Sequence, residues 1–168
     1  MKSKLFFAVS VLAVAILAGC NRDAGVASSF KADAKPIKLA EEVARAKAEN
    51  KLLLLEFGSS DSCPPCEKFE KDVFSKPEFL AYEKSNLVFL RADFPFRTSL
   101  PADVNATNNL LSKQFDAAGF PTFVALDQSG NEVWRIPAKD DPAPTIDIKL
   151  FKPSEFIALL ETLKAKSK

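Results

Sequence analysis

The chain has 168 residues, of which 47% are hydrophobic, enough for one globular domain with an extension. Its 23 lysines and arginines nearly balance 22 aspartates and glutamates, so no broad basic face is indicated and we expect no nucleic-acid partner. The chain contains no histidine, which excludes Ser-His and Cys-His nucleophilic pairs and histidine metal sites. Three cysteines remain as candidates for chemistry.

The first twenty residues have the layout of a secretory signal. A cationic start, residues 1–4, precedes an apolar run over residues 5–17. As a helix this run would rise about 20 Å, short of the roughly 30 Å hydrocarbon core of a bilayer, which favours a cleaved signal over a permanent span. The sequence Leu17-Ala18-Gly19-Cys20 resembles the lipobox of bacterial lipoproteins, which implies removal of residues 1–19 and lipidation of Cys20. The alternatives are an ordinary signal peptide with a free Cys20, or an uncleaved anchor.

The lipobox resemblance also implies a location. A lipidated Cys20 would hold the protein on a membrane of the cell envelope, facing the periplasm. Asn21 instead of aspartate after that cysteine favours the outer membrane in a Gram-negative cell. Residues 20–37 are mostly small and polar and lack apolar periodicity, so we expect a flexible tether there and a folded domain over 38–168.

Apolar periodicity and turn residues predict alternating helices and strands in that domain. In chain order we expect a helix at 38–49, a strand at 52–57, a helix after Cys63 that ends before Pro77, a strand at 87–90, a helix at 106–117, strands at 122–126 and 132–136, and a helix from 153. Gly119 should end the helix at 106–117, and residues 127–131 should form the turn of a hairpin. Long loops are expected at 94–106 and 137–149, either covering the site or, as we favour, decorating the surface.

The strongest candidate site is the pair Cys63 and Cys66, between a buried strand and a helix. A helix N-terminus presents unpaired N–H groups and partial positive charge, which can lower a cysteine pKa from ~8.5 to between ~3.5 and ~7.5. Cys63 is therefore predicted to be the nucleophile and Cys66 the cysteine that resolves a mixed disulfide with the substrate. Pro64 and Pro65 lack N–H groups, and their fixed φ suits a first helical turn.

Two other roles for the cysteine pair are less favoured. A structural disulfide across two residues closes a small loop and gives little entropic stabilisation. A zinc site needs four ligands, but the sequence has neither a second C-x-x-C nor a histidine to complete one. We therefore expect no metal and no cofactor.

Two motifs together resemble the thioredoxin superfamily: Cys63-Pro64-Pro65-Cys66 after a strand, and Gly119-Phe120-Pro121-Thr122 before the hairpin. The resemblance covers residues 38–166. The run Glu-Lys-Phe-Glu-Lys at 67–71, with Phe74, is most similar to exported members such as the C-terminal domain of the membrane transporter that reduces periplasmic disulfide enzymes. This implies a thioredoxin-like α/β fold, a central mixed sheet flanked by helices with a C-terminal hairpin and helix. It also implies protein disulfides as substrates and a membrane electron-donor protein as partner.

The resemblance further assigns residues around the dithiol. The Phe120–Pro121 peptide would be cis and lie against the dithiol, with the Phe120 backbone pairing with a bound substrate strand. Pro64, Pro65 and Ser62 would contact substrate from the dithiol side. Because the family usually has tryptophan where Ser62 stands, this wall of the site is smaller and more polar.

The family's buried proton-transfer acid usually lies six residues before the first cysteine, where this chain has Phe57. A one-residue bulge over 58–62 would bring Glu56 into that role. Otherwise Glu56 is simply a glutamate at a strand end.

The leading hypothesis is an envelope thiol:disulfide oxidoreductase. C-x-x-C proteins span from about −270 to about −120 mV, so the dithiol alone does not fix the direction. The histidine-containing dipeptide of the strongest oxidants is absent, which favours a reductase over an oxidase or isomerase.

A tethered binding or adaptor module, docking through Phe94, Phe96 and Phe120, is the alternative. Copper delivery is disfavoured, because copper chaperones of this fold generally use wider cysteine spacing and a histidine.

Overall fold

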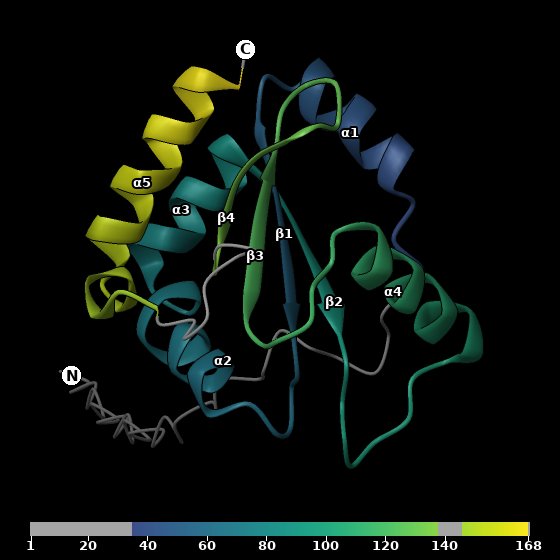
Figure 1. Ribbon diagram of the computed structural model, residues 1–168. Helices are drawn as coiled ribbons and strands as arrows, with labels where there is room; N and C mark the ends of the chain where they lie inside the picture. The colour runs from purple at the N-terminus through teal and green to yellow at the C-terminus, as the bar shows by residue number, and fades with distance from the viewer. Residues whose placement is uncertain (1–34, 138–145, 168) are drawn as a thin grey trace, which may run out of the picture.

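The computed structural model describes residues 35–137 and 146–167, and within them four strands form one mixed sheet in the order β2-β1-β3-β4 (Figure 1). The strands are β1 (Leu52–Gly58), β2 (Leu87–Asp93), β3 (Thr122–Leu126) and β4 (Glu132–Ile136). Strand β1 runs parallel to β2 and antiparallel to β3, and β3 and β4 form the antiparallel hairpin. The predicted central mixed sheet and C-terminal hairpin are therefore confirmed.

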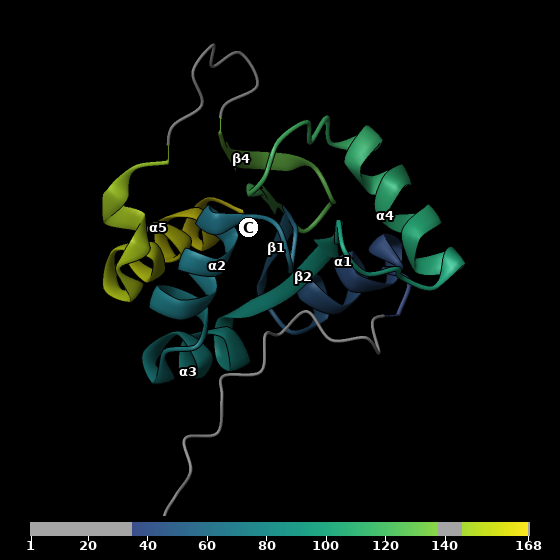
Figure 2. The same ribbon diagram turned by 90° about the horizontal axis from the view of Figure 1, so that it is seen from below.

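Helices cover both faces of the sheet (Figures 1 and 2). One face carries α1 (Leu39–Ala48) and α4 (Ala102–Gln114). The other carries α2 (Pro64–Phe69), the π-helical turn η1 (Glu70–Phe74), α3 (Pro77–Asn86) and α5 (Pro153–Lys166), with the 3₁₀ turn η2 (Ile148–Phe151) before α5. This two-sided cover explains why all seven residues of β1 are buried.

The side chains of β1 alternate between two apolar cores. Leu52 and Leu54 face α2, α3 and α5, whereas Leu53, Leu55 and Phe57 face α1 and α4. The first core is rich in phenylalanine, with Phe69, Phe74, Phe79, Phe123 and Phe156 all buried. Full burial of such a side chain contributes roughly 1.5–3 kcal/mol, so these two layers hold β1 in the middle of the domain.

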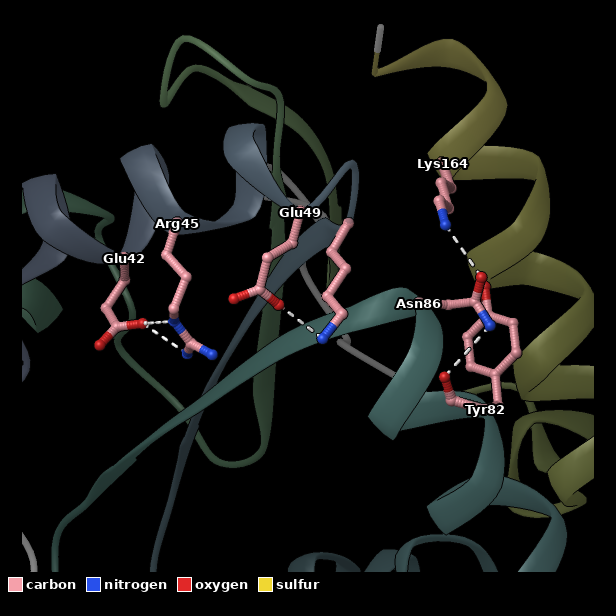
Figure 3. Close-up of polar contacts among 7 residues, drawn as sticks. Glu42, Arg45, Glu49, Tyr82, Asn86 and Lys164 are labelled. Atoms are coloured by element: carbon pink, nitrogen blue, oxygen red, sulfur yellow. Dashed lines mark hydrogen bonds and ion pairs between the residues drawn. The ribbon is translucent and has the colours of Figure 1, made fainter.

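Side-chain hydrogen bonds and ion pairs lie along α1 and between α3 and α5 (Figure 3). The Lys164 ammonium donates to the Asn86 side-chain oxygen at 2.9 Å, and the Asn86 amide donates to the Tyr82 carbonyl at 3.2 Å, which joins α5 to α3. On α1, Arg45 pairs with Glu42. Exposed ion pairs of this kind contribute about 0–1 kcal/mol, so the apolar layers dominate the stability of the fold.

The predicted helix boundaries need three corrections. Helix α4 begins at Ala102, not 106, because Pro101 serves as its N-cap and Asp103 lies in its first turn. It ends at Gln114, and the residue with positive φ after it is Asp116 (φ 51°), not Gly119. Pro77 does end the preceding helix, but it also opens α3, which the sequence analysis missed.

Several expectations lie outside the described residues. The signal segment, Cys20 and most of the tether precede residue 35, and the loop at 137–149 is described only at its two ends. Among the described residues, no helix is long and apolar enough to cross a membrane.

Candidate active site

Cys63 and Cys66 form a disulfide at the N-terminus of α2, just beyond the end of β1. Cys63 is the N-cap residue, and its Sγ accepts the backbone N–H of Cys66 at 3.2 Å. Pro64 opens the helix, as predicted from its missing N–H. The two residues are 5% and 2% exposed, so both cysteines are buried in the disulfide form. An N–H directed at Sγ favours negative charge on that sulfur after reduction.

Next to the disulfide lies an apolar groove of about 410 Å³. It is lined by Pro65, Gly119, Phe120, Pro121, Pro137, Ile146 and Phe151. The Phe120–Pro121 peptide is cis, and the Thr122 hydroxyl closes the preceding turn by donating to the Gly119 carbonyl at 2.7 Å. The fold therefore brings Pro65 of the dithiol loop together with Phe120 and Pro121, which stand more than fifty positions later in the sequence.

Pro64 and Ser62 are exposed and are not among the residues that line this groove. The Ser62 hydroxyl lies 2.8 Å from the Ser59 hydroxyl, within the turn that leads to Cys63. Ser62 therefore belongs to a short polar turn, residues 59–62, that leads from β1 to the dithiol.

Asp61 connects this polar turn to the loop after β2. Its carboxylate accepts the backbone N–H groups of Phe96 at 2.7 Å, Arg97 at 2.8 Å and Thr98 at 3.2 Å. These hydrogen bonds, with that of Phe96 foremost, hold the pKa of Asp61 below its ordinary value. This contact was not predicted from the sequence, where the only signal is an aspartate two residues before a candidate nucleophile.

The same loop region carries an aromatic cluster. The rings of Phe94 and Phe120 are stacked with centroids 5.2 Å apart. Phe96 is 86% exposed and Phe120 42% exposed. Because Phe120 also lines the groove, the aromatic pair and the groove form one continuous apolar area beside the dithiol.

Glu56 is fully buried on β1 and follows Leu52 and Leu54 at two-residue spacing, so it faces the side that α2 covers. Its Oε2 lies 2.8 Å from Nε of Arg91, its register partner on β2. Burial raises the pKa of Glu56 to about 7, although the Arg91 charge opposes this. Glu56 is therefore a buried acid within the strand, with a pKa raised by burial toward neutral pH.

The partners of Glu56 were not predicted from the sequence. Arg91 follows Leu87 and Phe89 at two-residue spacing on a buried strand, which directs a charged side chain toward the core. A buried charge requires a partner. Glu56 is a buried acid on the neighbouring strand, and its pairing with Arg91 follows once the register of the two strands is known.

The matching family model is described as thioredoxin-like and covers residues 33–128, more than half of the chain. Disulfide bond reductase DsbH of Chlamydia pneumoniae is 29% identical over 97 residues, which are 58% of this chain and 58% of that protein. Thiol:disulfide interchange protein DsbD 2 of Pseudomonas aeruginosa is 31% identical over 114 residues, 68% of this chain and 18% of that protein. In each case the match spans less than two thirds of the relative's length.

Solved structures agree on the fold. A DsbH oxidoreductase structure aligns with a TM-score of 0.59 at 23% identity, covering 77% of this chain and 82% of that one. A thioredoxin-fold protein from Helicobacter pylori gives 0.50 at 20% identity, with 77% and 81% covered. The sheet order, the position of the disulfide and the matched family model together show that the chain belongs to the thioredoxin-like family.

Proposed function

We propose that the protein is a thiol:disulfide oxidoreductase that reduces protein disulfides in the cell envelope. The observation that carries this proposal is the Cys63–Cys66 disulfide at a helix N-terminus, beside an apolar groove. The relatives DsbH, a disulfide bond reductase, and DsbD, a thiol:disulfide interchange protein, support the same chemistry. The absence of histidine leaves cysteine thiolate chemistry as the main nucleophilic route.

The reaction uses the dithiol as a donor of two electrons. Cys63 thiolate attacks one sulfur of the substrate disulfide, the substrate S–S bond breaks, and the departing substrate sulfur takes up a proton. Cys66 then loses its proton and attacks Cys63 Sγ in the mixed disulfide. The second substrate sulfur leaves and is protonated, so the substrate becomes a dithiol and Cys63–Cys66 becomes a disulfide. Glu56, ionised in part near pH 7, is a suitable acceptor for the Cys66 proton.

The groove gives the substrate strand a place to bind. Pro65 and Pro121 both line it, and the backbone of Phe120, next to the cis bond, is proposed to pair with an extended peptide. Ser62 and Pro64 are exposed beside the two cysteines in the sequence, where they would contact a bound substrate outside the groove.

An insulin-reduction assay tests the proposed function. Wild-type protein should reduce insulin disulfides with a dithiol donor, and Cys63→Ser should reduce them no faster than the donor alone. Cys66→Ser should accumulate a mixed disulfide through Cys63, visible as an added substrate mass after acid quenching. Wild-type turnover no better than that of Cys63→Ser would refute the enzyme function.

Location and anchoring are part of the same proposal. The signal-like segment and Leu17-Ala18-Gly19-Cys20 support export and lipidation of Cys20, with residues 20–37 as tether. A membrane protein with its own dithiol would then return electrons to Cys63–Cys66. Labelled palmitate should enter the wild-type protein and not Cys20→Ala, and the wild type should fractionate with outer membranes. Equal labelling of both proteins would contradict the anchor.

A binding or adaptor module remains the second candidate because of the aromatic area beside the dithiol. Phe96 is 86% exposed, and Phe120 stacks on Phe94 at the rim of the groove. An adaptor would retain protein binding in the Cys63→Ser/Cys66→Ser double variant and lose it in Phe96→Ser. An oxidoreductase loses turnover in the double variant.

A further inference from the structure

Arg91 joins two carboxylates from different elements in the layer between the sheet and the helix that carries the dithiol. Its Nε lies 2.8 Å from Glu56 Oε2, and its Nη1 lies 2.8 Å from Glu70 Oε2. The side chains of Glu56, Arg91 and Glu70 are 1%, 13% and 16% exposed. Charges so far out of water interact more strongly than they would at the surface.

Two aromatic rings define the position of the guanidinium. Its Cζ lies 4.5 Å from the ring centroid of Phe74 and 4.7 Å from that of Phe89, within the range of cation–π attraction. The planar guanidinium can serve two carboxylates at once, which a lysine ammonium does less well. The rings and the carboxylates therefore favour one orientation in which Arg91 contacts both acids.

This bridge reaches the helix of the dithiol directly. The backbone N–H of Glu70 donates to the carbonyl of Cys66, four residues earlier, so the two side chains lie one turn apart on the same face of the helix. Glu56 comes from β1, beneath that helix. Arg91 thus connects the buried acid of the sheet to the turn that follows Cys66.

We propose that Arg91 is a positioning residue of the redox reaction, which divides its charge between Glu56 and Glu70 and so sets how readily Glu56 takes up a proton. The inference rests on the proposed function, in which Glu56 accepts the Cys66 proton during exchange. Electrons pass only between sulfurs, from the dithiol to the substrate disulfide. The proton held by Glu56 leaves to water or to the departing substrate thiolate.

The charged groups around Glu56 act in opposite directions. Burial is the largest influence and raises the Glu56 pKa to about 7, Arg91 lowers it, and Glu70 and Asp93 raise it. Glu83 of α3 also faces Arg91 and Glu70, while the register partner on β3 is the uncharged Phe123. Removal of the Arg91 charge should therefore raise the Glu56 pKa, and removal of the Glu70 charge should lower it.

The test follows the Glu56 carboxyl by ¹³C NMR titration in the oxidised and reduced protein, alongside the pH dependence of the dithiol potential. In R91Q the Glu56 midpoint should rise by about one pH unit or more, and in E70Q it should fall. R91K keeps a charge but bridges less well, so its midpoint should lie between wild type and R91Q. R45Q removes an arginine that pairs with Glu42 on α1, on the other face of the sheet, and should leave the midpoint unchanged.

A Glu56 midpoint that rises in R91Q and falls in E70Q supports the inference. Midpoints that stay at the wild-type value, or that move in the same direction in both variants, overturn it. Where R91Q does not fold, E70Q and R91K decide: a Glu56 midpoint in E70Q at or above the wild-type value overturns the inference. Glu56 titrates whether or not insulin is reduced, so this result is independent of turnover. Wild-type protein that cannot reduce insulin refutes the proposed function instead.

Discussion

Asp93 and Ser60, 33 residues apart in the sequence, are joined by two hydrogen bonds of 2.8 Å, in which the backbone N–H and the hydroxyl of Ser60 both donate to the Asp93 carboxylate. Asp93 is the last residue of β2, and Ser60 lies in the turn between β1 and Cys63. Asp93 itself is buried, and burial raises the pKa of its carboxyl while the Ser60 contacts oppose this. The turn that leads to the dithiol is thus attached to the neighbouring strand.

Asp93→Ala should lower the free energy of unfolding by about 1–3 kcal/mol, because it leaves the Ser60 donors without their acceptor. Ser60→Ala removes only the hydroxyl bond and should have a smaller effect. Urea unfolding at pH 7 measures both variants. Equal effects of the two would show that the backbone N–H bond contributes nothing.

Asp61→Ala should loosen the loop after β2 without unfolding the domain. Amide hydrogen exchange at Phe96, Arg97 and Thr98 should accelerate about tenfold, because three hydrogen bonds to a charged acceptor are lost. Asp103→Ala is the matched control, because among the described residues that carboxylate accepts a hydrogen bond from the Val104 backbone inside α4 and none from this loop. Faster exchange at the same three amides in both variants would contradict the assignment.

The same contact has a defined pH range. Because the pKa of Asp61 is lowered in the folded protein, its stabilisation is present above the ordinary aspartate pKa of ~3.9 and is lost as the pH falls through the lower folded value. Protection factors of the three amides should therefore be similar at pH 7 and pH 5. A large loss of protection between those two values would show that Asp61 does not hold the loop.

Glu56→Gln should change how stability depends on pH. The folded pKa of Glu56, about 7, lies above the ordinary value of ~4.3, so the folded protein holds more protons than the unfolded chain between these values. Stability from this group therefore falls as the pH rises from ~4.3 to about 7, by roughly 3 kcal/mol over the full range. The difference in unfolding free energy between wild type and Glu56→Gln, followed from pH 5 to pH 8, should show this slope. A difference that stays constant would refute the raised pKa.

Phe69→Ala should be the most destabilising of these changes. The Phe69 ring lies within 4.5–5.6 Å of four others, those of Phe74, Phe123, Phe151 and Phe156. Truncation of a buried phenylalanine typically costs about 3–5 kcal/mol. Leu110→Ala on α4, where the side chain is 67% exposed, should change the free energy of unfolding by at most about 0.5 kcal/mol. Thermal or urea unfolding of both variants provides the comparison.

The strands could be predicted because the signal for each lies in a few consecutive residues. Leu52–Leu55 and Leu87–Leu90 are unbroken apolar runs of four residues, a length typical of a strand that is covered on both faces. The hairpin was also predictable, since Asp127 accepts hydrogen bonds within its own turn and Gly130 supplies the positive φ of 84°. The cysteine pair could be placed because it lies between such a strand and the start of a helix.

The contacts around the dithiol could not be predicted in the same way. Asp61 binds backbone groups 35 to 37 residues later, and backbone N–H groups carry no sequence signature. Arg91 and Glu56 meet only once the register of two strands is known. Helix α3 was missed because Pro77 was interpreted only as a stop, although the same residue suits a first helical position.

The π-helical turn after α2 has a consequence for the order of residues behind the dithiol. The N–H of Ser75 donates to the carbonyl of Glu70, five residues back, at 2.9 Å, so the turn holds one residue more than an α-helical turn. This wider turn lets Phe69 and Phe74, five positions apart, stack with ring planes 15° from parallel. Deletion of one residue from this turn would rotate Phe74 away and remove a face on which the Arg91 guanidinium rests. The number of residues between Cys66 and Phe74 is therefore constrained. Substitutions can preserve this spacing, whereas deletion of a single residue cannot.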